Sequence, residues 1–305
     1  MKAKYVSEII KQRRKELGVT QGMVCEGLCT IMTLSRFESG KQTPSWDCAA
    51  AILQRLGLPD DELCAHLTKE ELRLVRLRKE VIAYRRQFKQ ALGEEKERAR
   101  AKVLEKLYDL ERCVKKTDRI NQQFIRMIRA ITEPFSPQNR LEMLMEAIRM
   151  TSPRFDLDKI DSCLYSANEI VIINQIAVTY SRCGRPRKAI DIYGQLLKLL
   201  LKRTPNHEYL PLIAYNYARN LTLENRPEEA LEFAELARKT CVRQEHYYLL
   251  PKILHVEAEC YYLMKETGKT EELYRSAYYI YGAIGNASDR EILRIAAEES
   301  LNLVF

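Results

Sequence analysis

Apolar residues in the first 60 positions recur at intervals of three and four, as in a helix with one buried face. Gly18 follows the first of these patterns and is suited to end that helix. Thr20 is suited to cap a short second helix, QGMVCEGL. The apolar positions of the first helix are Val6, Ile9, Ile10 and Leu17.

A third short helix is predicted for the run IMTLSRFES, where apolar residues occur at every third position. We expect Ile31, Leu34 and Phe37 to form its inward stripe. The opposite face then presents a polar, hydrogen-bonding surface that includes Thr33 and Arg36.

The segment after this helix predicts a turn and a restart. Gly40 can adopt the left-handed conformation that closes a helix. We expect Thr43 to cap the next helix and Pro44 to occupy its first position, where no amide donor is needed. Four or five short helices within about 65 residues, two of them joined by a tight turn, predict a helix-turn-helix.

The run LGVTQGMVCEGLCTIMTLSRFESGKQTPSWDCAAAILQRLGL resembles the DNA-binding domain of phage repressors and Cro proteins, the Xre class. The T-Q start of helix 2, the S-R-x-E-S-G end of helix 3 and the following P-S carry this resemblance. The span from Gln21 to Glu38 is one residue shorter than in phage repressors. In this it is similar to the peptide-pheromone receptors of Gram-positive bacteria, the Rap, Rgg, NprR, PlcR and PrgX group.

The resemblance implies roles for individual residues. An arginine of helix 1, Arg14, is expected to pair with Glu38 of helix 3, since a partly buried carboxylate needs a fixed donor. Arg36 is the best candidate for a bidentate contact to guanine. The alternative is that this helical module binds a protein. The full set of expected DNA contacts is Gln21, Thr30, Met32, Thr33, Arg36, Lys41 and Gln42.

From Thr68 onward, a long helix carries an apolar seam with alternating steps of three and four, which is suited to a partner helix. The partner is either the same helix of a second subunit or the following helix, which repeats the pattern. The first seam consists of Leu74, Leu77, Val81, Tyr84 and Phe88, and the second of Val103, Leu107, Leu110 and Val114.

Residues 118–305 resemble tetratricopeptide repeats that are longer than the usual 34 residues. The segments IAVTYSRCGRPRKAIDIY, YARNLTLENRPEEALEFA and ECYYLMKETGKTEELYRS align as helix, turn and helix. We align Ala177, Ala218 and Cys260, at steps of 41 and 42, with Ala189, Ala230 and Glu272 marking the second helices. Helices over 118–132 and 137–151 are expected to be degenerate repeats of the same stack.

Stacked helix pairs form a superhelix whose concave face is lined by the first helix of each pair. Asparagine and arginine side chains on such a face suit an extended peptide, whose backbone needs donors and acceptors and whose carboxylate needs a cation. The alternative is that polar residues merely line the solenoid. The expected peptide-binding residues are Asn174, Val178, Arg182, Tyr215, Asn216, Arg219, Asn220, Glu257 and Tyr261.

The net charge of +8 is unevenly placed. Residues 71–117 carry 15 Lys and Arg against 8 Asp and Glu, whereas residues 118–305 carry 25 of each. The positive excess therefore follows the helix-turn-helix directly. It is either a solvated helix face or a source of attraction for phosphate beside a DNA reader.

The nine cysteines, an odd number with no CxxC pair, indicate reduced thiols rather than a disulfide framework. Cys25 and Cys29 lie four apart, but no partnering pair follows at zinc spacing, so we expect no metal site. No GxGxxG, Walker, GxSxG or HExxH motif occurs, so we expect no enzyme and no cofactor.

These patterns predict an all-α protein with a helix-turn-helix domain at 1–66, a basic linker helix at 67–92 and a repeat domain at 93–305 for ligand sensing and dimerisation. We expect a cytoplasmic homodimeric transcription regulator that binds palindromic double-stranded DNA under the control of a short linear peptide, with no membrane segment. One rival is a constitutive regulator whose repeats only dimerise. The other is an adaptor whose repeats bind a protein partner.

Overall fold

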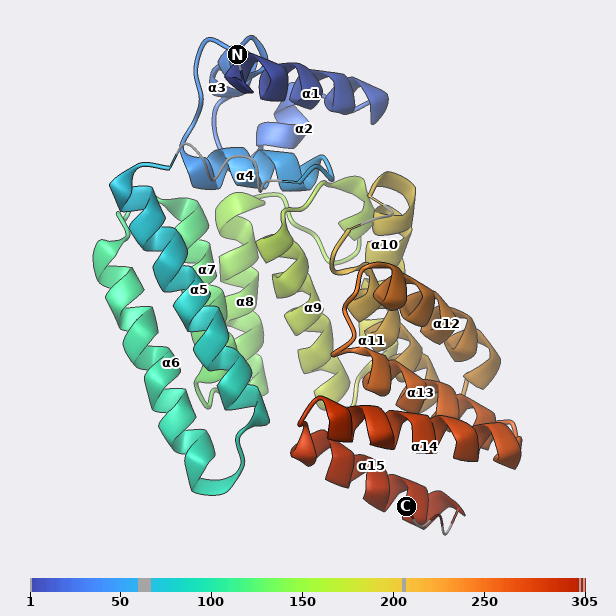
Figure 1. Cartoon of the computed structure of the whole chain (residues 1–305). Helices are drawn as coiled ribbons and strands as arrows, with labels where there is room; N and C mark the ends of the chain where they lie inside the picture. Colours follow the sequence, from blue (N-terminus) through green and yellow to red (C-terminus); the bar gives the residue numbers. More distant parts are fainter. Residues whose placement is uncertain (1, 60–66, 205–206, 302, 304) are drawn as a thin grey trace. The chain divides into compact units, whose positions relative to one another are not determined.

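The structure, a computed structural model, describes residues 2–59, 67–204, 207–301, 303 and 305, so Cys64 and His66 lie outside the described residues. Every regular element in these ranges is helical, which confirms the predicted fold class (Figure 1). The helices are α1 (Lys2–Glu16), α2 (Gln21–Cys25), α3 (Ile31–Glu38), α4 (Trp46–Arg55), α5 (Lys69–Gln90), α6 (Gly93–Cys113), α7 (Arg119–Thr132), α8 (Pro137–Thr151), a 3-10 turn (Ile160–Ser162), α9 (Ala167–Arg182), α10 (Pro186–Arg203), α11 (Leu210–Leu223), α12 (Pro227–Arg243), α13 (Leu250–Leu263), α14 (Thr267–Ala283) and α15 (Ala287–Leu301).

The chain divides into two compact units. Unit 1 contains Met1–Thr179 and Leu201–Thr204, and unit 2 contains Tyr180–Leu200 and Pro205–Phe305. The helix-turn-helix segment α1–α4 therefore belongs to the same unit as α5–α8 and most of α9. The division of the chain at residues 66 and 92 stays a prediction.

Local capping explains the helices of the helix-turn-helix segment. The Thr20 Oγ1 accepts a hydrogen bond from the Met23 amide at 3.2 Å, and the Thr30 Oγ1 accepts one from the Thr33 amide at 3.1 Å. Gly40, which follows Ser39, the C-cap of α3, has a φ of 70° and takes the left-handed conformation predicted for it.

The start of α4 differs from the prediction. The helix begins at Trp46 with Ser45 at the N-cap, two residues later than the expected cap at Thr43. Ser45 makes no side-chain cap bond; instead the Trp46 amide donates to the Glu71 Oε1 of α5 at 2.9 Å. A carboxylate distant in sequence thus replaces the local cap, which the sequence around Pro44 does not reveal.

The core of the helix-turn-helix segment confirms two of the three residues of the predicted α3 stripe. Leu34 and Phe37 are buried, but 56% of the Ile31 surface is exposed. Steps of three residues fall short of a full helical turn, so Ile31 lies at the edge of the stripe and faces outward. The core also receives Leu164, and Ile120 packs against it, so it continues into the rest of unit 1.

Helices α5 and α6 form a hairpin in which they run side by side (Figure 1). A capping box starts α5: the Thr68 side chain accepts from the Glu71 amide, while the Glu71 carboxylate accepts from the Thr68 amide. Val81 of α5 is fully buried, as are Val103 and Leu110 of α6. The apolar residues of the predicted seam therefore pack between α5 and α6 of the same chain.

The repeats continue as helix hairpins. In unit 1, α7 packs against α8, and the bounds of both helices lie within one residue of those predicted. In unit 2, α11 packs against α12, α13 against α14, and α14 against α15. Alanine at the crossings allows close approach, and Ala218, Ala230 and Ala234 are buried in one cluster.

The register of the third repeat is two residues away from the prediction. Helices α11 and α13 begin at Leu210 and Leu250, a step of 40 rather than 42. The turn after each helix holds a non-glycine residue with positive φ, Asn225 at 55° and Lys265 at 64°, again 40 apart. The partner of Ala230 is therefore Thr270, which is fully buried, and not Glu272.

Candidate functional site

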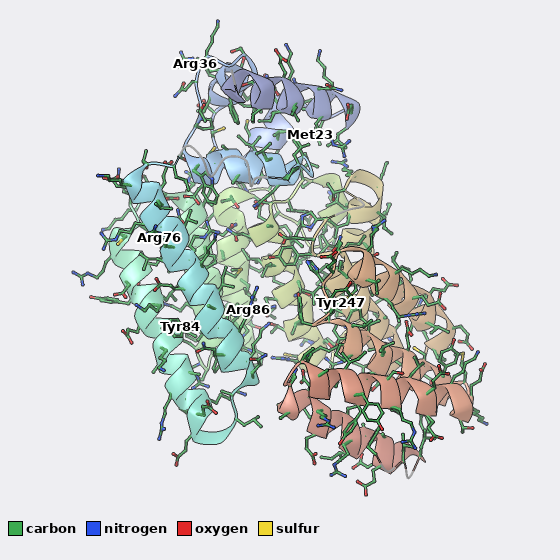
Figure 2. The ribbon with its side chains drawn as sticks, in the orientation of Figure 1. Met23, Arg36, Arg76, Tyr84, Arg86 and Tyr247 are labelled. Atoms are coloured by element: carbon green, nitrogen blue, oxygen red, sulfur yellow. The ribbon has the colours of Figure 1, made fainter. Side chains whose placement is uncertain are left out.

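The outer face of α3 is available to a ligand. Met32 is 63% exposed, Thr30 and Arg36 are exposed, and Thr33 is half-buried. Figure 2 shows Arg36 at the outer surface of the helix-turn-helix segment. Lys41 and Gln42 are also exposed, in the turn that follows α3.

Several of these predicted contact residues also have structural roles. Thr30 caps α3, and its hydroxyl lies 2.9 Å from that of Thr33. The Gln21 amide donates to the Glu38 Oε2 at 2.8 Å, so this side chain is engaged within the segment. Arg36 and Lys41 are exposed cations on this face.

Arg14 and Glu38 join α1 to α3 through a two-point ion pair. The Arg14 Nε and Nη2 donate to the two Glu38 oxygens at 2.6 Å and 2.9 Å. Only 4% of the Glu38 side chain is exposed. Burial opposes ionisation, but the hydrogen bonds from Arg14 and Gln21 outweigh it and hold the pKa of Glu38 below its usual value. This pair therefore fixes the orientation of α3.

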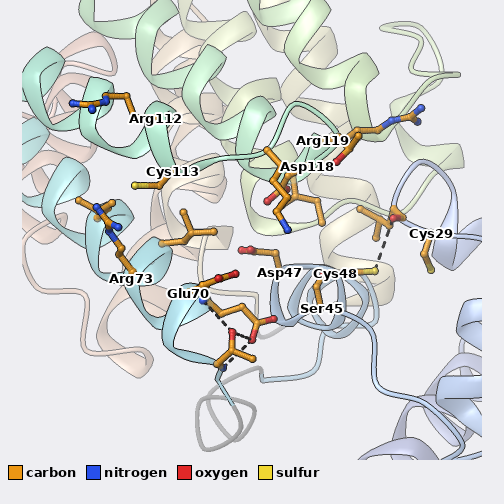
Figure 3. A pocket seen from close by; sticks show the side chains of 18 of the residues that line it. Cys29, Ser45, Asp47, Cys48, Glu70, Arg73, Arg112, Cys113, Asp118 and Arg119 are labelled. Carbon is orange, nitrogen blue, oxygen red and sulfur yellow. Dashed lines mark hydrogen bonds between the residues drawn. The ribbon is translucent and has the colours of Figure 1, made fainter.

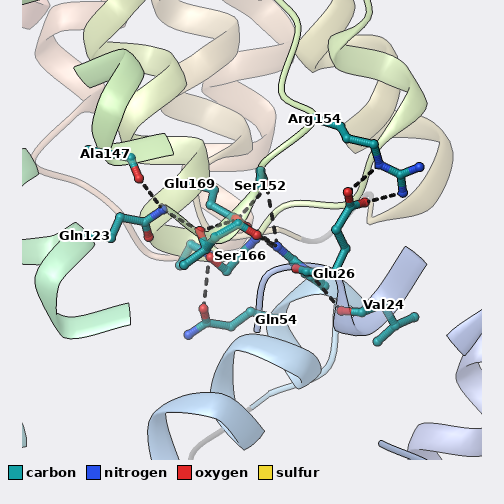
Figure 4. A network of polar contacts seen from close by, with 12 residues as sticks. Val24, Glu26, Gln54, Gln123, Ala147, Ser152, Arg154, Ser166 and Glu169 are labelled. Carbon is teal, nitrogen blue, oxygen red and sulfur yellow. Dashed lines mark hydrogen bonds and ion pairs between the residues drawn. The ribbon is translucent and has the colours of Figure 1, made fainter. Parts of the chain in front are cut away.

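A buried polar network that the sequence analysis missed attaches α4 to α8 and α9 within unit 1 (Figure 4). The Arg55 Nη2 donates to the Glu169 Oε1 at 2.8 Å and to the Thr151 carbonyl oxygen at 3.0 Å. The Arg55 Nη1 donates to the carbonyl oxygens of Val24 and Glu26, at 3.0 Å and 2.7 Å. One guanidinium thus satisfies the ends of α2 and α8 together.

A second polar contact holds α4 against α5 and α7. The Asp47 carboxylate accepts from the Arg78 Nη1 at 2.9 Å and from the Asn121 Nδ2 at 2.8 Å. Burial raises the pKa of Asp47, and the Arg78 charge opposes this rise. The sequence carried one signal for such contacts: Arg55 falls on the buried face of α4, between Ile52 and Leu56.

The predicted peptide-binding residues of unit 1 lie on α9. Asn174 is only 4% exposed and Val178 is half-buried. Asn174 already takes part in an interaction within the protein. Its amide is therefore less open to solvent than the sequence led us to expect.

In unit 2, the predicted residues Tyr215 and Arg219 lie close to two residues of α13 that the sequence analysis missed. Arg219 is exposed, and its charge acts on both His255 and Glu259. Burial lowers the pKa of His255 to about 4, and the Arg219 charge adds to this effect. Burial raises the pKa of Glu259, against the influence of Arg219. The step of 40 aligns Tyr215 with His255 and Arg219 with Glu259, so the register error concealed them.

Glu257, which the two-residue error placed on this surface, is 2% exposed. Its Oε1 accepts from the Arg238 Nε of α12 at 2.8 Å. Burial raises its pKa, and the Arg238 charge opposes this. Tyr261 faces Lys269 of α14, whose Nζ lies 4.6 Å from the ring centroid. The positions of both residues favour structural roles.

The remaining predicted residues of unit 2 differ in exposure. Arg182 is exposed, and Asn216 is half-buried. Asn220 is buried, and its Nδ2 donates to the Asn216 carbonyl oxygen at 2.7 Å. Its Oδ1 is buried without a hydrogen-bond partner among the described residues.

Among the residues that the structure describes, no group of three or more His, Cys, Asp or Glu side chains is arranged to hold a metal ion. None of the described helices combines the length and apolar composition that crossing a membrane requires.

Similar folds occur in solved structures of regulators. The chain matches PlcR of Bacillus thuringiensis, crystallised in complex with the peptide PapR7 and DNA, with a TM-score of 0.60, 21% identity, and 95% of this chain and 99% of that chain covered. It also matches ComR from S. thermophilus in complex with DNA and its signalling peptide ComS, with a TM-score of 0.54, 18% identity, and 97% and 99% covered. At these sequence identities, the two matches show that this chain has a similar fold.

Two domain families match separate stretches of the chain. No curated protein sequence matches it. Residues 8–67 match a helix-turn-helix domain, and residues 146–295 match the RNPP family C-terminal domain. These matches confirm the resemblance found in the sequence, and they identify the chain as a helix-turn-helix protein that carries an RNPP family C-terminal domain.

Proposed function

We propose that this protein is a transcription regulator, not an enzyme, that reads DNA through α3 and responds to a short linear peptide bound by its repeats. The observation that carries the proposal is the solvent-facing surface of α3, oriented by the Arg14–Glu38 pair, in a chain with an RNPP family C-terminal domain. The related PlcR structure contains both a peptide and DNA.

The DNA-binding step requires two copies of α3. A helix of eight residues reaches only a few base pairs, which gives little affinity by itself. Two copies in a homodimer would contact half-sites about 34 Å apart in a palindromic operator. Arg36 would donate to guanine and Met32 would contact thymine methyl groups, while Lys41 would lie beside phosphate. This action requires access to DNA, so we place the protein in the cytoplasm.

The peptide-binding step would use the polar residues of the repeats. An extended peptide exposes amide donors, carbonyl acceptors and a terminal carboxylate. Arg219, which is exposed, would supply the cation for that carboxylate. Asn174, Val178, Arg182 and Tyr215 remain candidates for further contacts.

Fluorescence anisotropy with labelled DNA from upstream of the gene would test the proposal. We expect specific binding whose affinity changes when a synthetic peptide, encoded by a neighbouring short reading frame, is added. Linkage requires DNA to change peptide affinity by the same factor. A protein that binds none of these DNA fragments at low salt, with or without peptide, would contradict the proposal.

Two variants separate base reading from charge. Replacing Arg36 by Ala should weaken binding by about 1–3 kcal/mol and relax one base position. Replacing Lys41 by Ala should weaken binding equally on all sequences and reduce its dependence on salt.

Arg219→Ala should remove the response to peptide while leaving the affinity of the unliganded protein for DNA unchanged.

A further inference from the structure

Three cysteines gather where α2 leads into α3. Cys25 and Cys48 are buried in the helix-turn-helix core, and Cys29 packs against the same cluster from a half-buried position. The Cys29 amide donates to the Cys25 carbonyl oxygen at 3.1 Å, so these two residues lie on one turn of chain. The spacing of Cys25 and Cys29 is visible in the sequence, but nothing in the sequence places Cys48 beside them.

The Cys48 thiol lies against the peptide bond that leads into Cys29. Its Sγ is 3.9 Å from the carbonyl oxygen of Leu28, the residue before Cys29 (Figure 3). The Cys29 and Cys48 thiols lie close enough to affect each other's pKa. Because Cys48 lies against the peptide bond that joins Leu28 to Cys29, rotation of the two side chains is the movement that would bring their sulfur atoms together.

Cys29 and Cys48 also line a cavity of about 1310 Å³ within unit 1, whereas Cys25 does not (Figure 3). A small reagent therefore has a route to Cys29 and Cys48. Cys113 lines the same cavity from α6. It provides a matched control, because it shares the access route without the contact to Cys29.

The surroundings divide the two thiols into a nucleophile and its partner. The Cys48 thiol lowers the pKa of Cys29, against the effect of burial, and the charge of Arg55 assists. The Cys29 thiol and burial raise the pKa of Cys48. Cys29 is therefore the thiol that becomes a thiolate and reacts first.

We propose that Cys29 and Cys48 form a reversible disulfide that fastens the start of α3 to α4, with a hydroperoxide as the oxidant. The Cys29 thiolate attacks one peroxide oxygen, so an S–O bond forms, the O–O bond breaks, and hydroxide leaves as water after taking a proton. Cys48, after losing its proton, then attacks the Cys29 sulfur. The S–S bond forms and the S–O bond breaks, releasing a second water.

The disulfide would change the reading surface because Cys29 directly precedes Thr30, the cap of α3. Drawing Cys29 towards Cys48 displaces the Thr30 hydroxyl from the Thr33 amide, which it meets at 3.1 Å in the reduced protein. We expect the oxidised protein to bind DNA more weakly. This consequence rests on the proposed function, whereas formation of the disulfide does not.

Mass spectrometry of the full-length protein after hydrogen peroxide treatment, alkylation and trypsin digestion tests the disulfide directly. Cys29 lies in the tryptic peptide 16–36 and Cys48 in the peptide 42–55. We expect the two peptides to be joined, with a mass lower than their sum by two hydrogens, and to separate in dithiothreitol. Fragmentation should place the bond on Cys29. Absence of the joined species, or a bond on Cys25 instead, would overturn the proposal.

DNA binding tests the consequence, and the mass spectrum distinguishes its failure from failure of the proposed function. Peroxide should weaken DNA binding of the unmodified protein about five-fold or more, at the lower end of ordinary coupling between sites. Cys29→Ser and Cys48→Ser should not respond, and Cys113→Ser should respond like the unmodified protein. Unchanged affinity in protein shown to be fully cross-linked would refute the effect on α3.

Discussion

Arg55 and Glu169 lie 114 positions apart in the sequence and form an ion pair of 2.8 Å in the interior of unit 1. Their side chains are 1% and 0% exposed. Burial opposes ionisation of Glu169, but the charge and hydrogen bonds of Arg55 keep the pKa of Glu169 below its usual value. The pair joins the last turn of α4 to the first turn of α9, so the helix-turn-helix segment is held to the following helices of its unit.

Glu169→Gln tests the energetic weight of this pair. Glutamine preserves the size and one acceptor oxygen, so the variant leaves the Arg55 charge buried and uncompensated. We expect the free energy of unfolding, measured by urea denaturation, to fall by about 3–5 kcal/mol. Glu224→Gln is the control, because its partner Arg187 is 88% exposed, and it should cost under about 1 kcal/mol. Equal losses in the two variants would show that Arg55 finds another partner.

Gly27→Ala tests the contact between the α2–α3 turn and α8. Gly27 has a φ of 70°, and a Cβ added there would lie 2.0 Å from the Thr151 carbonyl oxygen. The turn would have to move away from α8, so we expect the melting temperature to fall steeply. Gly18→Ala shares the positive φ, at 64°, but its Cβ would meet no atom within 4 Å.

Gly18→Ala should therefore lose only the cost of the left-handed conformation, about 1–2 kcal/mol. The difference between the two variants isolates the steric contact. Similar losses in both would mean that the α2–α3 turn is not pressed against α8 in solution.

These contacts show why part of unit 1 could not be predicted. Helical periodicity and the caps Thr20 and Thr30 follow from local chemistry, and the structure has them as expected. The Trp46 amide, by contrast, is satisfied by Glu71, and Arg55 by Glu169. Such pairings depend on how helices pack, and no rule of spacing connects residues so far apart.

Arg14 and Glu38 allow a double-mutant test of the pair that orients α3. Each single replacement, Arg14→Met or Glu38→Gln, leaves one partly buried charge without its partner, so both should destabilise the protein. The double variant should lose less than the sum, with a coupling of about 1–3 kcal/mol. Thermal unfolding provides the measurement, and strictly additive losses would show that the pair contributes nothing beyond its separate side chains.

The predicted register of the third repeat was wrong for a different reason. Small residues mark helix crossings, and both Ala258 and Cys260 are small and fully buried on α13. Aligning Ala218 with Cys260 gave a step of 42, whereas the turn residues Asn225 and Lys265 give 40. The backbone conformation of the turns decides the register, and a lysine with positive φ carries no signal in its side chain. His255 and Glu259 were lost with that register.

His255 should make the stability of the protein depend on pH. Its pKa falls from the ordinary 6.5 to about 4 because burial and the nearby Arg219 disfavour the charged ring. Between these values the unfolded chain binds a proton at His255 that the folded chain does not. The contribution of His255 to the free energy of unfolding is therefore fully present above pH 6.5, and it is lost as the pH falls towards 4. A shift of this size corresponds to about 3 kcal/mol.

The measurement compares melting temperatures of the unmodified protein and His255→Gln from pH 7.5 to 4, in steps of about half a unit. Groups distant from His255 titrate in both proteins and cancel in the difference between the two curves, whereas Glu259, whose Oε1 lies 3.6 Å from the His255 Nε2, titrates together with it. We expect His255→Gln to be the less stable protein at pH 7.5. It loses the packing of the imidazole ring against Tyr274, whose ring centroid lies 5.6 Å from that of His255. The gap should close as the pH falls, because only the unmodified protein must exclude a proton. Parallel curves would mean that the imidazole is solvated and that the surface beside Arg219 is more open than the structure shows.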